Sequence, residues 1–254
     1  GKPLATVFHG SEQAVSAMRN GTAVHRSQIS VDFNFDGHPD LVSGFGNVAG
    51  GGFIVLHRGN PEAFQPEDER VLSDLRRGIF PPAFEKDAFL LDAPVAPDFI
   101  VAGRFAEGST LDIVFAARGG RSLFLLSSDS RGGFYPAREI PLDGEITALV
   151  SDLFDMSKTF SGLAVALKGK ETSTVAVFDG SKEIFKTRPR SFSVENKIDS
   201  LLLINPEGAV LDKNLLVLAG GEIFEIARIG NEKAALEKIA LPFRAAAFAA
   251  GEFI

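Results

Sequence analysis

The chain repeats one pattern, in which an apolar segment, a short polar loop and a second apolar segment follow one another. Copies recur roughly 50 residues apart, a period typical of repeat architectures. A longer first interval is explained by an insertion at about 61–97. The copies are ISVDFNFDGHPDLVSGF (29–45), FIVAGRFAEGSTLDIVFA (99–116), ITALVSDLFDMSKTFSGLAVAL (146–167) and IDSLLLINPEGAVLDKNLLVLA (198–219), and AAAFAAGEFI (245–254) starts like a fifth. Their alignment makes Asp32, Arg104, Asp152, Ile204 and Glu252 equivalent.

The segments inside each unit are short and rich in Val, Ile, Leu and Phe. Gly, Asn, Asp and Ser separate them, as in GGFIVLHRGN and TSTVAVFDGS. This is the pattern of strands and turns rather than of helices. Four strands in about 50 residues is the size of a propeller blade. We therefore predict an all-β fold, a β-propeller of four-stranded antiparallel blades with about four to five blade units in the chain. A β-sandwich with accidental internal similarity is the alternative.

This reading divides a single propeller, or a segment of one, into consecutive units. Both ends of the chain fall inside a unit, so we expect it to be part of a longer chain. A ring closed by joining the two ends is the alternative. The expected units are the outer strands of a blade (1–27), a blade with an insertion at about 61–97 (28–97), three further blades (98–145, 146–197 and 198–244), and the inner strand of the next blade (245–254).

Composition excludes several classes of function. The net charge of −7 does not favour a nucleic-acid surface, which needs clustered Lys and Arg. The chain has no cysteine, so disulfides and thiol-ligated metals are excluded. No apolar run reaches the 18 or so residues of a membrane-spanning helix. We expect no nucleic-acid partner and no membrane span in this segment.

The first copy contains the strongest site motif, VDFNFDGHPDL at 31–41. Asp32, Asn34, Asp36 and Asp40 occupy positions 1, 3, 5 and 9 of a short window, and the backbone carbonyl of His38 falls at position 7. Calcium takes six to eight such oxygens in flexible geometry, whereas magnesium is stricter. An EF-hand or dockerin loop needs an acid at position 12, which here is Ser43. The spacing predicts one calcium site, with a metal-free Asx turn as the alternative.

This loop resembles the calcium loop of FG-GAP/VCBS-repeat β-propellers, the blades of integrin α-chain heads and many bacterial surface proteins. The resemblance implies that Asp32, Asn34, Asp36, Asp40 and the His38 carbonyl hold Ca²⁺ in a structural role. Gly44-Phe45-Gly46 stands where integrins have Gly-Ala-Pro, which is closer to the bacterial variants.

The later copies have lost the set of ligands. The second has Arg104, Ala106, Gly108 and Asp112 at the corresponding places, and Arg104 is near enough in sequence to pair with Asp112 instead. The third keeps Asp152 but continues with Phe154 and Met156, and the fourth reads Ile204-Asn205-Pro206.

Catalytic motifs are weak elsewhere. GFGNVAGG (44–51) has the spacing of a dinucleotide fingerprint, but a strand rather than a helix follows it. His9, His25, His38 and His57 form no recognised metal spacing. Glu67, Asp68 and Glu69 lie in the insertion, where PEDERVLSDLRRG reads as a charged and partly helical excursion around 67–77. Such an excursion is either a solvated surface or a partner contact.

We therefore predict a non-catalytic, calcium-stabilised scaffold that binds protein partners at the cell surface or envelope, and we expect it to be a subunit of a larger envelope assembly. The extracytoplasmic location follows from the resemblance and from the high free calcium that a weak site needs. A propeller-based polysaccharide lyase or hydrolase is the first alternative, with Arg104, Asp152 and Glu252 at the inner strand ends. A glycan-binding lectin is the second. With 23 Phe, no Trp and Tyr135 as the single Tyr, the composition favours packing over sugar stacking.

Overall fold

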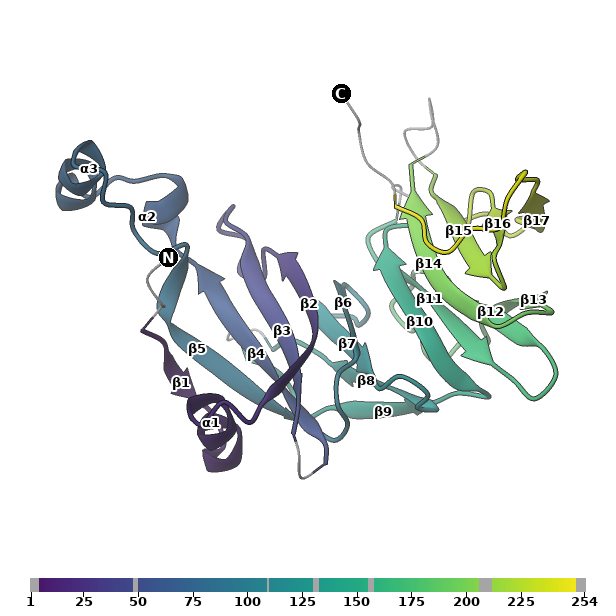
Figure 1. Cartoon of the computed structure of the whole chain (residues 1–254), viewed down its shortest axis with the longest axis horizontal. Helices are drawn as coiled ribbons and strands as arrows, with labels where there is room; N and C mark the ends of the chain where they lie inside the picture. The colour runs from purple at the N-terminus through teal and green to yellow at the C-terminus, as the bar shows by residue number, and fades with distance from the viewer. Residues whose placement is uncertain are drawn as a thin grey trace. The chain divides into compact units, whose positions relative to one another are not determined.

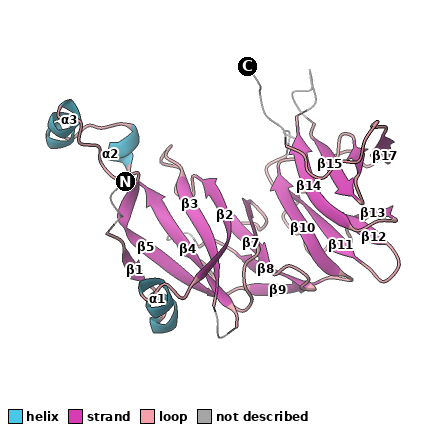
Figure 2. Cartoon of the chain, viewed as in Figure 1, coloured by secondary structure: helices cyan, strands magenta, loops and turns pink. Residues whose placement is uncertain are grey.

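The computed structural model describes residues 5–47, 50–108, 110–129, 133–154, 158–205 and 212–249. These residues form two compact units, Gly1–Ile100 and Val101–Ile254, within which strands dominate (Figures 1 and 2). The described strands belong to four separate sheets.

The first unit contains a five-stranded sheet and, among its described residues, three helices. The strand order is β1-β5-β4-β3-β2. Neighbouring strands from β2 to β5 are antiparallel, whereas β1 lies parallel to β5 with Val7 opposite Asp87. The elements are β1 (Val7–His9), α1 (Glu12–Arg19), β2 (Val24–Val31), β3 (Asp40–Gly46), β4 (Gly52–Gly59), α2 (Pro61–Phe64), α3 (Glu69–Arg76) and β5 (Phe84–Ala93).

Helix α1 packs on this sheet through its small residues. Ser11 caps it by accepting a hydrogen bond from the backbone N–H of Ala14, and Ala14 and Ala17 are buried. They join a hydrophobic cluster with Phe53 and Val55 of β4. The alanines allow a short helix to approach the sheet closely, and Val15 and Met18 of the same helix also pack against this cluster.

The second unit contains three four-stranded sheets, each with its strands side by side in chain order. Strand β6 begins one sheet, β10 the next and β14 the last. The strands are β6 (Phe99–Gly103), β7 (Asp112–Ala116), β8 (Ser122–Leu126) and β9 (Arg138–Pro141); β10 (Glu145–Asp152), β11 (Gly162–Lys168), β12 (Ser173–Phe178) and β13 (Arg190–Val194); β14 (Ile198–Ile204), β15 (Asn214–Ala219), β16 (Glu222–Ile226) and β17 (Leu236–Ile239).

The inner strands β7 and β11 are buried on both faces. Every residue of β7 is buried, and so are Gly162–Leu167 of β11. Such strands read as unbroken apolar runs because neither side chain direction faces water. One hydrophobic cluster joins the last two sheets into a common core. It includes Ala164 and Ala166 of β11 and Leu215 and Val217 of β15.

The predicted fold class is wrong as stated. The chain is all-β in its sheets, but its described residues form four separate sheets of four or five strands, and none of these sheets closes on itself. The first sheet is neither four-stranded nor wholly antiparallel, because β1 adds to it in parallel. A strand can return in parallel only through a long crossover, and here the chain between β1 and β5 includes the rest of the sheet.

Three of the predicted boundaries also need correction. Residues 1–27 do not supply the outer strands of a separate unit, because β1, α1 and the start of β2 lie there and belong to the first sheet. The segment 61–97 is not only an insertion, since it contains β5, which pairs with β4. The expected helix around 67–77 is present as α3. Residues 245–249 form no strand, and 250–254, including Glu252, lie outside the described residues.

Candidate metal centre

The candidate loop connects β2 to β3, with Asp32 directly after β2 and Asp40 as the first residue of β3. Asn34 and Asp36 are exposed, Asp32 is half-buried, and His38 and Asp40 are buried. The structure therefore places all five predicted ligand positions in one tight connection between two neighbouring strands.

Two left-handed residues give the loop its shape. Phe35 has φ 58° and Gly37 has φ 87°. Glycine adopts this conformation without strain, whereas Phe35 needs support from its surroundings. That support comes from the side chains on either side of it, because they bind the backbone of the bend.

Asp32 and Asp36 hold the bend through hydrogen bonds to the backbone. The Asp32 carboxylate accepts from the N–H of Asp36 (3.2 Å) and the N–H of Gly37 (2.9 Å). The Asp36 carboxylate accepts from the N–H of His38 (2.8 Å) and from the Asn34 amide nitrogen (2.7 Å). These side chains are consequently held against the backbone of the bend, although Asn34 and Asp36 remain exposed to solvent.

Asp40 anchors the loop to the sheet. Its side chain is 1% exposed, and its two oxygens accept from the N–H of Phe33 (2.9 Å) and the N–H of Gly59 at the end of β4 (2.8 Å). A Cβ on Gly59 would lie 2.7 Å from the carbonyl oxygen of Pro39, so only glycine allows this approach. The His38 ring stacks on Phe64 of α2, with centroids 5.4 Å apart.

The pKa values of the buried Asp40 and the exposed Asp36 are shifted in opposite directions. Burial raises the pKa of Asp40, and the charges of Asp36 and Asp32 raise it further, against the two backbone hydrogen bonds that lower it. For Asp36, burial also raises the pKa, but the hydrogen bonds from His38 and Asn34 and the electrostatic interactions with His38 and Arg58 outweigh it and lower the pKa overall. Asp40 is thus a buried acid that is repelled by its two neighbours.

The donor set fits a hard cation in its chemistry. Each carboxylate oxygen keeps a second lone pair after accepting one N–H, so the hydrogen bonds leave the ligands usable. A divalent cation would offset the repulsion between Asp40 and the other two acids. Within the described residues, however, no three His, Asp or Glu side chains by themselves form a metal-holding group. Coordination would therefore also need the Asn34 amide oxygen and the His38 carbonyl, which calcium accepts.

Two other copies of the repeat keep a polar residue at the place of Asp40, although they lack the other ligand positions of the loop. Asp112, the first residue of β7, is 0% exposed and accepts the N–H groups of Phe105 (2.8 Å), Ala106 (2.9 Å) and Ser128 (2.9 Å). Asn214, the first residue of β15, accepts the N–H of Arg228 (2.8 Å). Both residues lock a loop to the end of the third strand, as Asp40 does. Sequence reasoning did not assign this role, although the repeated Asp or Asn at a strand start was visible.

The third copy has glycine at the place of Asp40, and the ring of Phe154 lies against it. Gly162 starts β11, and Phe154 is 3% exposed and lies 2.2 Å from where a Cβ on Gly162 would be. Asp152, the equivalent of Asp32, forms an ion pair with Lys213. In this copy a ring and a cation of the chain itself fill the turn.

The described residues that the enzymatic and lectin alternatives would use make separate contacts with other parts of the chain or lie exposed. The guanidinium of Arg104 lies 5.0 Å from the centre of the Phe160 ring. Asp152 is engaged by Lys213. Tyr135 is 60% exposed and lies in a loop after β8.

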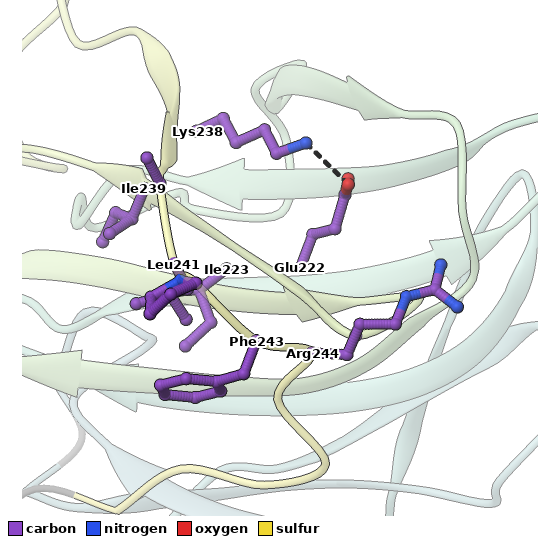
Figure 3. Close-up of a pocket in the computed structure, with 10 residues that line it drawn as sticks. Glu222, Ile223, Lys238, Ile239, Leu241, Phe243 and Arg244 are labelled. Carbon is purple, nitrogen blue, oxygen red and sulfur yellow. Dashed lines mark hydrogen bonds and ion pairs between the residues drawn. The ribbon is translucent and has the colours of Figure 1, made fainter.

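A surface groove at the end of the last sheet is shown in Figure 3. It has a volume of about 460 Å³ and is lined by Ile223, Leu241 and Phe243 with an ion pair between Glu222 and Lys238 (2.6 Å). Its lining residues include no histidine, serine or cysteine that could act as a base or nucleophile. This groove presents both apolar side chains and charged groups.

Comparisons with known proteins bear on the fold. No family model matches the sequence, and no curated protein matches it. Among solved structures, the chain is similar to BBS1N in its crystal structure with ARL6DN, soaked with lead. The TM-score is 0.52 at 16% identity, over 87% of this chain and 57% of that chain.

The similarity shows the fold alone. BBS1N is a β-propeller-containing domain, so the succession of small sheets in this chain is of a propeller-like kind. The chain spans little more than half the length of that protein. None of the helices in the described part has the length and apolar character that crossing a membrane requires.

Proposed function

We propose that this chain is a non-catalytic protein-interaction module whose first sheet is stabilised by one calcium ion in the loop between β2 and β3. The observation that carries the proposal is the geometry of this loop. Asp32, Asn34 and Asp36 are held by hydrogen bonds inside a bend with two left-handed residues, and a buried third acid, Asp40, lies at its base.

The loop residues have distinct roles in this proposal. Asp32, Asn34, Asp36 and the His38 carbonyl would hold the ion, and Asp40 would complete the set while it fixes the loop to β4. The ion would supply positive charge and cross-link the two strands. The chain's own hydrogen bonds orient the carboxylates and keep the loop closed.

The protein-binding role is supported by the sheets within each unit and by the structural neighbour. Rigid sheets with buried inner strands present loops and edges without needing to move. BBS1N, which has a similar fold, is found in complex with another protein, ARL6DN. We further propose an extracytoplasmic setting for this chain, because a weak calcium site fills only where free calcium is high.

Calcium binding is tested by titrating chelator-treated protein with CaCl₂ in a calorimeter, with MgCl₂ as competitor. We expect one site per chain, which Asp36→Asn weakens at least tenfold. Asp143→Asn removes an exposed acid outside the loop and serves as the matched control. Equal binding by Asp36→Asn and wild type, or no heat with wild type, would contradict the proposal.

The protein-binding role is tested by quantitative capture. Immobilised chain is incubated with the extract of its own cells, with and without an excess of soluble chain as competitor. We expect a small set of proteins that the soluble chain displaces. If no captured protein is displaced, the interaction role is refuted even when calcium binds.

A further inference from the structure

The segment between β4 and β5 carries an unusual share of exposed apolar side chains. Four of the ten large hydrophobic side chains that are exposed in the described part of the chain lie here: Phe64 (45%), Leu72 (37%), Ile79 (52%) and Phe80 (77%). Neither α2 nor α3 has a buried residue. Figure 1 shows α3 at the tip of this excursion, away from β4 and β5 of its own unit.

The sequence of α3 favours a helix, yet no residue of this helix is buried. Asp68 caps it by accepting the N–H of Arg70 (2.7 Å), Glu69 lies in the first turn and Arg76 in the last, and Gly78 (φ 75°) follows. An isolated helix of eight residues is marginal in water, since most helical stability comes from packing an apolar face. The half-buried Val71 and Leu75 and the exposed Leu72 form that face.

Two charged residues of opposite sign, Glu69 and Arg76, lie on one side of this apolar face. Residues advance by about 100° along a helix, so Glu69 and Arg76, two turns apart, lie on the same flank of the apolar stripe beside Leu72. Both side chains are exposed, and no ion pair joins either to another described residue. In an antiparallel pair related by a two-fold axis, a flank meets the same flank of the other helix. Glu69 of each copy then faces Arg76 of the other.

We propose that α3 pairs antiparallel with α3 of a second copy of this chain. Leu72, Leu75, Ile79 and Phe80 form the apolar centre, and two reciprocal Glu69–Arg76 ion pairs set the direction. The helix is only about 12 Å long, so the interface is small and the dimer weak. This inference deepens the proposed function, because it names a second copy as one protein partner.

The experiment is sedimentation velocity of the full chain in a series from about 5 to 500 µM, the range suited to small interfaces. We expect a concentration-dependent dimer. Glu69→Arg and Arg76→Glu each place like charges opposite each other and should weaken it at least tenfold. The double variant E69R/R76E restores the opposite charges and should restore the dimer, as should a mixture of the two single variants. Far-UV circular dichroism checks that α3 and the sheets remain folded.

The charge pattern makes the outcome decisive. A wild-type chain that stays monomeric throughout, or a dimer that both single variants leave unchanged, overturns the proposal. A dimer that Phe80→Ala weakens while the charge variants do not also overturns it, since another orientation or surface would then be used. Calcium titration of the same samples separates this outcome from failure of the metal site, which lies in a different loop.

Discussion

At the scale of single residues, the most consistent feature of the chain is a polar side chain at the start of the second strand of a sheet. Asp40 accepts a backbone N–H from Gly59, the last residue of β4. Asp112 and Asn214 accept one from Ser128 and Arg228, two residues beyond the ends of β8 and β16. A buried acceptor of this kind satisfies N–H groups that a loop would otherwise leave without a partner. The residue therefore serves the fold first, whether or not a cation is present.

Replacement of Asp112 by Ala should be severely destabilising. It would leave the two buried N–H groups of Phe105 and Ser128, and the part-buried N–H of Ala106, without this acceptor, and each buried group costs about 1–3 kcal/mol. We expect a loss of at least ~3 kcal/mol in the free energy of unfolding, measured by denaturant titration. Asp143→Ala, at an exposed acid, should change stability by less than ~0.5 kcal/mol. A loss below ~1 kcal/mol for Asp112→Ala would show that the N–H groups find other partners.

At the scale of elements, α1 shows how similar segments diverge. LATVFHGSEQ and TVAVFDGSKE match closely in sequence, but Glu12–Arg19 is a helix whereas residues 182–186 form turns. Both segments have a serine at the equivalent place, Ser11 and Ser181, but the contacts of the two hydroxyls differ: that of Ser181 has no hydrogen-bond partner in the described part of the chain, whereas that of Ser11 caps the helix. The Ser11 hydroxyl accepts from the N–H of Ala14 (3.3 Å) and donates to Asp92 beside the end of β5 (2.7 Å). The cap thus also ties the helix to its sheet.

Ser11→Ala should loosen this helix. Loss of an N-cap side chain costs about 1 kcal/mol, and loss of the hydrogen bond to Asp92 adds to it. We expect faster amide hydrogen exchange in 12–19 and a lower melting temperature. Ser73→Ala, on an exposed face of α3, is the control and should leave both unchanged. Unaltered exchange in 12–19 would mean that packing of Ala14 and Ala17 alone holds α1.

At the scale of the whole molecule, the third and fourth sheets are fastened together by a charged group as well as by their common core. Arg190 makes two hydrogen bonds to Asp179 (2.6 and 2.8 Å) and donates to the carbonyl oxygens of Ile229 and Asn231 beyond β16. The planar guanidinium can make these contacts at once, which an ammonium group cannot.

Arg190→Lys should therefore uncouple the two sheets although it keeps the charge. We expect faster exchange in both 190–194 and 229–231, and a loss of about 2 kcal/mol in the free energy of unfolding. Lys197→Ala, which removes an exposed surface pair with Asp199, is the control. Protection retained in 229–231 would show that the hydrophobic cluster is sufficient to hold the sheets together.

Sequence reasoning reached the strands of the second unit but missed β1 and β5 of the first. Apolar runs that recur in units of similar length identify β10–β12 and β14–β16. A strand that is buried on both faces has an uninterrupted apolar sequence, as in β11, β12 and β15. Strand β5, FEKDAFLLDA, has exposed charged residues along it and was assigned to an insertion. Strand β1 has three residues, too few to show any period.

The candidate loop could be found from sequence because its ligands are neighbours in the chain. Spacing alone places Asp32, Asn34 and Asp36 in one bend, which the structure describes with Phe35 and Gly37 in left-handed conformation. The bond from Gly59 to Asp40 joins residues 19 apart, and it depends on how β3 and β4 pair. Whether the loop holds calcium stays a prediction.

By itself, the sequence determined the all-β character, the recurring strand pairs and the acidic bend, because each depends on residues that are close in the chain. Tertiary structure alone decided that β1 joins β5 in parallel, that α1 packs on β4 and that no residue of α3 is buried. Those outcomes depend on contacts between distant segments, whose energies local patterns do not encode.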